Sequence, residues 1–157
     1  MNKVFRISPS QVERERKIQL TGELPVEFLG EPDTEMVKFS HPVKYSLELS
    51  ATLGGIVLNG QISTQTECVC GRCLNKFDSE LSAKICHFYE KDDSSELDIA
   101  EDVREDLLLE IPMNPNCSKN CKGLCLKCGQ DLNKKTCKCD DTPAGHPVWD
   151  DLKPVKK

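Results

Sequence analysis

The cysteines are the residues most able to do chemistry in this chain, and six of the ten lie between Cys117 and Cys139. Their order is C-x3-C-x3-C-x2-C-x8-C-x-C, and within it Cys125-Leu126-Lys127-Cys128-Gly129 has the form of a zinc knuckle. Such a tight turn points two sulfurs at one place, and a glycine relieves backbone crowding behind the second. Four thiolates can hold one tetrahedral Zn²⁺ at about 2.3 Å per bond, with no position left for a substrate water. We therefore predict a structural zinc site formed by Cys125, Cys128, Cys137 and Cys139.

Cys117 and Cys121 stand outside this set, and the sequence leaves three roles open for them. They could join the other four in a binuclear six-sulfur cluster, or they could remain free buried thiols. They could also meet Cys70 and Cys73 and attach the C-terminal segment to a sheet. The single four-sulfur site is our default, which two zinc ions per chain would contradict.

A further close pair of cysteines lies in Cys70-Gly71-Arg72-Cys73. This spacing serves metal knuckles and thioredoxin-type redox pairs alike. The redox pair stands at a helix N-terminus, whereas this one lies in an expected strand-to-strand connection. Arg72 could still lower a thiol pKa, so redox chemistry stays open. Cys68 and Cys86 lie on strand-like alternation, which predicts small buried hydrophobic residues.

No other group of residues suggests catalysis. His41 and His146 lie beside prolines in expected loops, without the partners of a catalytic unit. We therefore expect a protein that is not an enzyme and has no small-molecule substrate. Neither a signal peptide nor a membrane-spanning run is visible, which predicts a cytoplasmic protein with no membrane partner. Reducing conditions there favour metal over disulfides for clustered cysteines.

Charge and apolar residues are unevenly distributed over the 157 residues. The net charge is −5, yet residues 90–110 carry ten acids and two bases, and residues 117–157 carry nine Lys and five Asp. The same C-terminal stretch has few sizeable apolar side chains, so it needs a metal or disulfides to become ordered.

The elements that must position the cysteines are predicted from periodicity. Alternation in 43–49 predicts a strand, Gly54-Gly55 a turn, and 56–68 a return strand with a bulge or close approach at Gly60. A third strand is expected from Phe77, Leu81, Ile85 and Phe88. Ahead of these strands, the segment 18–35 is expected to be loop with short strands.

Two helices are expected around this sheet. Ser8, Pro9 and Gln11 indicate a capped start for a short polar helix over roughly 9–17. After an acidic loop at 90–97, Asp98 and Glu101 form a capping box, and Pro112 ends the helix. Its apolar face is formed by Ile99, Val103, Leu107 and Ile111.

These elements predict an α+β fold: an antiparallel β-meander or partly closed barrel with one amphipathic helix and a small C-terminal zinc-knuckle appendage. We expect a core domain over 1–115 and a cysteine-rich zinc-binding segment over 116–157.

Three stretches of the chain form a recognisable combination. Residues 70–77 have the form C-x-R-C-L-x-x-F, which includes Cys70, Arg72 and Cys73. Residues 105–113 have the form E-D-x-x-L-x-x-P at an expected helix end, and residues 121–133 the form C-K-G-L-C-x-x-C-G-x-x-L-N. Together they resemble the YceD-type family of large ribosomal RNA subunit accumulation proteins. The chain departs from the family at His146-Pro147-Val148-Trp149, where many members have Asp-Pro-Arg before an aromatic residue.

The resemblance implies a non-enzymatic role in synthesis, processing or stability of 23S ribosomal RNA and in building the large ribosomal subunit. The partner would be precursor 23S ribosomal RNA, a large-subunit ribosomal protein, or both. The acidic region 90–110 suits a basic protein better than RNA. The alternative is a thiol-based redox or metal-switch protein that uses its paired cysteines. Phosphate contacts are predicted for the lysines around the knuckles: Lys119, Lys122, Lys127, Lys134, Lys135 and Lys138.

Overall fold

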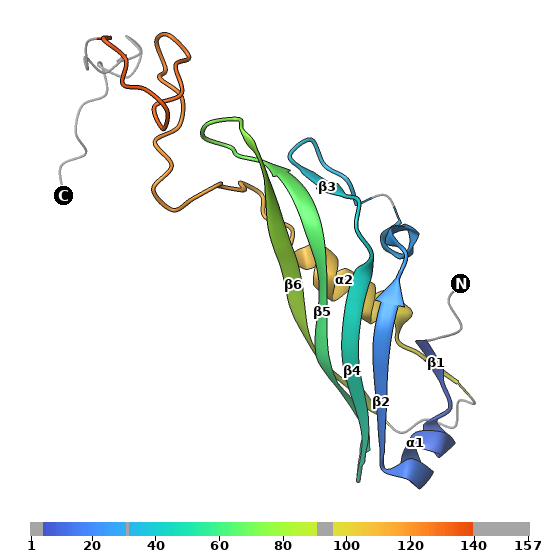
Figure 1. Ribbon diagram of the computed structural model, residues 1–157. Coiled ribbons are helices and arrows are strands. Elements are labelled where there is room, and N and C mark those ends of the chain that lie inside the picture. Colours follow the sequence, from blue (N-terminus) through green and yellow to red (C-terminus); the bar gives the residue numbers. More distant parts are fainter. Residues whose placement is uncertain (1–4, 31, 91–95, 140–157) are drawn as a thin grey trace, which may run out of the picture.

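Figure 1 shows a computed structural model of the chain, in which residues 5–30, 32–90 and 96–139 are described. Its centre is a five-stranded sheet in which all paired neighbours are antiparallel. Strand β5 (Gly55–Val69) lies in the middle, with β6 (Lys76–Glu90) on one side and β4 (Val43–Thr52) and β3 (Val37–Phe39) on the other. The sheet curves along its length and stays open, and the predicted α+β class is confirmed.

The long hairpin β5–β6 follows directly from the apolar alternation in the sequence. Its register runs unbroken from Gly55↔Glu90 to Val69↔Lys76. Because alternate residues of a strand face opposite sides, Ile62, Thr64, Thr66 and Cys68 are all buried on one face. Phe88 has the opposite parity to Leu81 and Ile85, and its side chain is 55% exposed, so its expected place beside them is wrong.

Gly60 is a close approach and not a bulge, since the β4–β5 pairing continues through it without interruption. A Cβ atom at this position would lie 2.2 Å from the Ser46 carbonyl oxygen and 2.8 Å from the Leu47 Cα. The missing side chain therefore lets β4 and β5 pair at their normal spacing.

Strand β2 (Lys17–Leu24) corrects the prediction that 18–35 is mainly loop. All eight of its residues pair with β4, which makes it an edge strand. Its polar residues and Gly22 obscure the pattern because one face of an edge strand is solvated. The short 3-10 helix η2 (Val26–Leu29) follows and buries Leu29.

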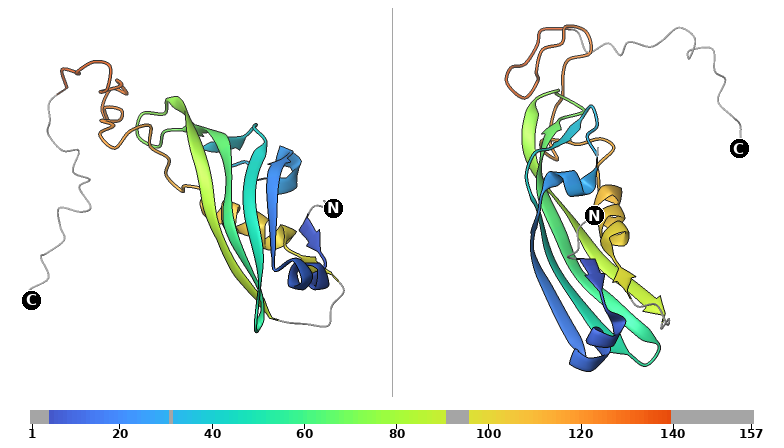
Figure 2. Two further views of the ribbon diagram at one scale, coloured as in Figure 1. Left: turned by 60° about the horizontal axis from the view of Figure 1, so that its bottom comes forward. Right: turned by 90° about the vertical axis from the view of Figure 1, so that its right-hand side faces the viewer.

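The buried face of the sheet is covered by two helices and a small second sheet (Figure 2). Helix α2 (Ala100–Leu109) packs on β6 and β5 and buries Val103 and Leu107. Helix α1 (Pro9–Glu15) buries Val12, and β1 (Arg6–Ile7) pairs with β7 (Leu97–Asp98). Phe5 packs against Phe28 and Tyr45 at ring-centroid distances of 5.6 and 5.2 Å.

The predicted start of α1 is correct and that of α2 is one residue early, and neither predicted capping box is formed. Ser8 is the N-cap of α1 and Pro9 its first residue, but the Gln11 amide donates to Glu15 instead of completing a capping box. In α2 the N-cap is Ile99, and Asp98 accepts a hydrogen bond from the Ala100 N–H at 3.0 Å. Helix α2 ends at Leu109, ahead of Pro112.

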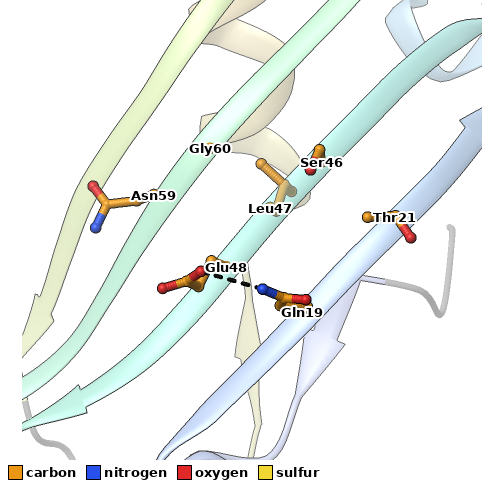
Figure 3. A pocket seen from close by; sticks show the side chains of 7 residues that line it. All are labelled: Gln19, Thr21, Ser46, Leu47, Glu48, Asn59 and Gly60. Atoms are coloured by element: carbon orange, nitrogen blue, oxygen red, sulfur yellow. Dashed lines mark hydrogen bonds between the residues drawn. The ribbon is translucent and has the colours of Figure 1, made fainter.

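The other face of the sheet carries no helix among the described residues (Figure 2). The residues that face this side are largely polar. A shallow pocket there is lined by Gln19, Thr21, Ser46, Leu47, Glu48, Asn59 and Gly60 (Figure 3). Cys86 also lies on this face and is exposed, which corrects its prediction as a buried residue, whereas Cys68 is buried as predicted. Residues 91–95, within the expected acidic loop, and His146 lie outside the described residues. No described helix has the length and apolar character needed to cross a membrane.

Candidate metal centre

Two turns of the chain have the same knuckle backbone. In the first, at the β5–β6 connection, the Leu74 N–H donates to the Cys70 carbonyl at 2.9 Å and the Cys70 N–H to the Asn75 carbonyl at 2.9 Å. In the second, Gly129 and Cys125 make the equivalent bonds, to the carbonyls of Cys125 and Gln130, each at 2.8 Å. The residue after the second cysteine has a left-handed backbone in both turns, with φ of 56° at Leu74 and 72° at Gly129. Cys70-Gly71-Arg72-Cys73 is therefore a knuckle in which leucine occupies the position that favours glycine.

The structure brings eight cysteines into two groups of four, which we name site A (Cys70, Cys73, Cys117 and Cys121) and site B (Cys125, Cys128, Cys137 and Cys139). Within each group all sulfurs lie within 4.8 Å of one another. Of the three roles open for Cys117 and Cys121, the structure thus has the one in which they meet the Cys70–Cys73 pair.

Sulfur separations in site A fit a tetrahedral metal. The Sγ atoms of Cys70 and Cys121 are 3.8 Å apart, and those of Cys73 and Cys117 are 3.7 Å apart. A tetrahedron with metal–sulfur bonds of about 2.3 Å has edges of about 3.8 Å. A disulfide needs about 2.05 Å. The residues therefore fit a four-thiolate metal such as Zn²⁺, which supplies a cross-link when bound; the structure leaves the identity of the metal open.

Site A joins the hairpin turn to the segment that follows α2. Cys70, Cys73 and Cys121 are buried, and Phe77 and Leu124 pack against them. The Gly71 N–H donates to the Pro115 carbonyl at 2.8 Å, and the Leu124 N–H to the Arg72 carbonyl at 3.0 Å. The Arg72 guanidinium also donates to the Cys121 carbonyl at 3.2 Å. This set of contacts spans the predicted boundary between 1–115 and 116–157, which stays a prediction.

Site B is more open to solvent and is built from the chain after Leu124 alone. Cys128 is exposed, and Cys125, Cys137 and Cys139 are half-buried. A bridge between Leu124 and Asp131, and a hydrogen bond of 2.9 Å from the Leu132 N–H to the Gly123 carbonyl, fold the loop back on the knuckle.

Backbone dipoles favour a thiolate at the first cysteine of each knuckle. Burial opposes ionisation of Cys70, but the N–H groups of Cys117, Cys73 and Arg72 outweigh it and lower its pKa to about 6. The N–H groups of Cys128 and Lys127 lower the pKa of Cys125 to about 6. Hydrogen bonding with Cys121 and Cys128 raises the pKa of Cys117 and of Cys139, respectively, to about 12. Full ionisation of either group therefore needs a cation among the sulfurs.

The remaining candidate residues are placed around these sites without entering them. The six tail lysines, Lys119, Lys122, Lys127, Lys134, Lys135 and Lys138, are all exposed. The sequence did not predict a site role for Asn75, Asp131 and Asn133. In the structure, the amides of Asn75 and Asn133 contact sulfurs of site A, and the Asp131 carboxylate lies between these two amides. Their only sequence signal is that Asn75 follows the first knuckle and Asp131 and Asn133 follow the second.

Comparison with known proteins gives a consistent family. Residues 87–156 match the model of the family described as "Large ribosomal RNA subunit accumulation protein YceD". A "Large ribosomal RNA subunit accumulation protein YCED homolog 1, chloroplastic" from Arabidopsis thaliana is 48% identical over 44 residues, which cover 28% of this chain and 14% of the relative. The maize protein of the same name is 47% identical over 45 residues, or 28% of this chain and 15% of the relative.

A more distant match reaches further along the chain. An uncharacterized protein of Mycobacterium tuberculosis is 22% identical over 102 residues, covering 55% of this chain and 49% of the relative. The match thus spans about half of that relative and a much smaller share of the chloroplastic ones. No solved structure is significantly similar to this chain. The family model over residues 87–156 and the names of the two chloroplastic relatives support the resemblance of this chain to the YceD-type family.

Proposed function

We propose that this chain is a non-enzymatic factor that supports synthesis, processing or stability of 23S ribosomal RNA, and that its tail binds RNA phosphates. The family description and the names of the chloroplastic relatives support the link to large-subunit ribosomal RNA. The RNA contact is our inference from the charge around the two cysteine sites. We place this activity in the cytoplasm, where thiols stay reduced.

The observation that carries the proposal is the excess of positive charge around the sites. Residues 70–76 and 116–139 contain eight Lys and Arg and one Asp, a formal charge of +7. Two sites of four thiolates and one Zn²⁺ would each contribute about −2, which leaves a net charge of about +3. The surface therefore stays positive even when both sites are loaded.

The tail lysines also differ from those of the sheet in their partners. Lys17 and Lys44 pair with Glu48 and Glu23 at 2.8 and 3.8 Å. In the described part of the chain, Lys119, Lys122, Lys135 and Lys138 have no carboxylate within 4 Å, and the one tail acid, Asp131, lies 3.8 Å from Lys134. Residues 116–139 contain no aromatic side chain for base stacking, which favours phosphate recognition.

Helix α2 supports a second contact, with a basic protein. Glu101 and Glu105 are exposed on it and Glu110 directly after it, whereas Asp102 and Asp106 are held by Tyr89 and His87 of β6. This acidic surface would repel RNA, so we assign a ribosomal protein to it and RNA to the tail.

The test is charge reversal on the tail. A variant with Lys119, Lys122 and Lys135 changed to Glu should lose RNA association in crosslinking from growing cells. In vitro, the slope of log K against log salt should become shallower by about 2, since each phosphate contact on a single strand contributes about 0.7. The matched control changes Lys38, Lys44 and Lys84 of the sheet to Glu. Equal effects of the two triple variants, or no effect of either, would remove the tail from the RNA contact.

Metal removal distinguishes RNA binding by an ordered surface from RNA binding by positive charge alone. Chelation removes about two negative charges per site once the thiols are protonated, so a disordered basic tail would bind RNA more tightly after chelation. An ordered phosphate-binding surface would bind it less tightly. We expect the weaker binding.

A further inference from the structure

Asp131 lies at the centre of a hydrogen-bond network that reaches two sulfurs of site A. Its Oδ2 accepts from the Asn75 amide at 2.8 Å, and its Oδ1 accepts from the Asn133 amide at 2.9 Å. The Asn133 backbone N–H also donates to Oδ1, at 2.9 Å. The Asn75 amide, followed by the Asn133 backbone and side-chain N–H groups, holds the pKa of the Asp131 carboxyl below its usual value.

The same two amides contact ligand sulfurs of site A. The Asn75 Nδ2 donates to the Cys73 Sγ at 3.4 Å, and the Asn133 Nδ2 donates to the Cys121 Sγ at 3.4 Å. The side-chain Oδ1 of Asn133 accepts from the Lys122 backbone N–H at 2.8 Å, which fixes the orientation of the side-chain amide. The Asp131 carboxylate therefore orients two amides. One donates to the Cys73 sulfur in the hairpin turn, and the other donates to the Cys121 sulfur in the tail.

Asp131 and Asn133 belong, however, to the loop that site B closes. They lie between Cys128 and Cys137, the second and third ligands of that site. The bridge between Leu124 and Asp131 places this loop against the start of the second knuckle. The outer shell of site A is thus built in part from the loop of site B.

We propose that Asp131 is a positioning residue that couples the two metal sites, so that loading site B strengthens metal binding at site A. Closure of site B holds Asp131 and Asn133 in place, and they complete the donors to the Cys73 and Cys121 sulfurs. Outer-shell partners of metal ligands typically change metal affinity 10- to 100-fold. Because coupling is reciprocal, metal in site A strengthens site B by the same factor. This inference depends on metal binding by the sites and not on the RNA contact.

The experiment titrates the reduced full chain with Cd²⁺ and follows each site by ¹¹³Cd NMR, with affinities from competition against a chelator. Asp131→Ala should weaken site A about 10- to 100-fold and shift the site A resonance, because the Asn75 and Asn133 amides that donate to its sulfurs are no longer held in place. Asn75→Ala should shift the site A resonance and leave that of site B in place. Asp78→Asn, on the open face of the sheet, is the matched control and should change neither.

A double-mutant cycle tests the coupling itself. Replacing Cys137 and Cys139 by Ser should weaken site A in the wild-type background and cause little further loss in the Asp131→Ala background. Circular dichroism verifies that each variant keeps its sheet, and the Asn75 variant gives an answer if Asp131→Ala unfolds the tail. Two Cd²⁺ bound with additive losses would overturn the coupling alone. A chain that binds no Cd²⁺ would overturn the metal sites on which it depends.

Discussion

Replacing Cys73 by Ser should destabilise the whole sheet domain, because site A closes a large loop. Cys73 and Cys117 are 44 residues apart, and the chain between them contains β6 and α2. To bind the same metal, the unfolded chain must close this loop, at a free-energy cost of about 4 kcal/mol by the chain-entropy relation for cross-links. A saturating metal should therefore stabilise the fold by about 4 kcal/mol, a large part of the 5–15 kcal/mol typical of domains.

Site B should have a smaller effect on the sheet. Cys128 and Cys137 enclose only a short loop in the tail, so Cys128→Ser should disorder that segment and act on the sheet only through the coupling to site A, which lowers the free energy of unfolding by about 1.4–2.8 kcal/mol for a 10- to 100-fold weaker site A. Cys86→Ser is the matched control, since Cys86 is exposed on the sheet and belongs to neither site. It should leave stability unchanged.

The assay is urea unfolding with saturating zinc under reducing conditions, followed by far-UV circular dichroism. Equal losses for the Cys73 and Cys128 variants would refute the cross-link reasoning. So would an unfolding free energy for Cys73→Ser that matches the Cys86 control.

Three further predictions concern the sheet that holds the first knuckle and helix α2 packed on it. Gly60→Ala should lower the free energy of unfolding in urea by about 3 kcal/mol, because the new Cβ would meet the carbonyl oxygen of β4 2.2 Å away. Leu107→Ala should lose about 3 kcal/mol in the same assay, since Leu107 is 0% exposed, whereas Leu109→Ala, at a residue 83% exposed, should lose less than about 0.5. Tyr89 should ionise well above the ordinary tyrosine pKa of 10.0 in an ultraviolet pH titration, because burial and the hydrogen bond to Asp102 raise its pKa. The stability that this shift contributes is present below pH 10 and is lost as the pH rises above it. Asp102→Asn should lower the pH at which Tyr89 ionises.

The sheet could be predicted from sequence where each strand has one buried face. Alternation in β4 and β5 marks the buried side residue by residue, and the four-residue spacing of Ile99, Val103 and Leu107 marks the buried side of α2. Strand β2 is different because Gly22 interrupts the pattern and polar residues fill its solvated side. The apolar contribution of such an edge strand depends on what packs against it, which local periodicity does not encode.

Site B could be predicted because its ligands are local, whereas site A joins residues 44 to 51 apart. The C-x2-C spacing at Cys70 equals that at Cys125, but leucine in place of the knuckle glycine hides the likeness. Leu74 is 62% exposed and adopts a φ of 56°, which costs about 1–2 kcal/mol for a non-glycine residue. Which pairs meet is decided by the β5–β6 register and by the path of α2, both of which are tertiary features.

The β5–β6 hairpin by itself positions two of the four site A cysteines, Cys70 and Cys73. The β5–β6 pairing extends to Val69↔Lys76, so the knuckle between them is held by the last pair of a long hairpin. Helix α2 packs along the sheet, and the chain after it reaches Pro115, whose carbonyl accepts a hydrogen bond from the Gly71 N–H. Cys117 and Cys121 follow within six residues, in a segment with few apolar side chains of its own. The hydrophobic core thus fixes the position of the first knuckle, and the sulfurs fix the tail to it. Any role of the tail lysines therefore depends on an order that a metal bound to these sulfurs would supply and that the sheet makes possible.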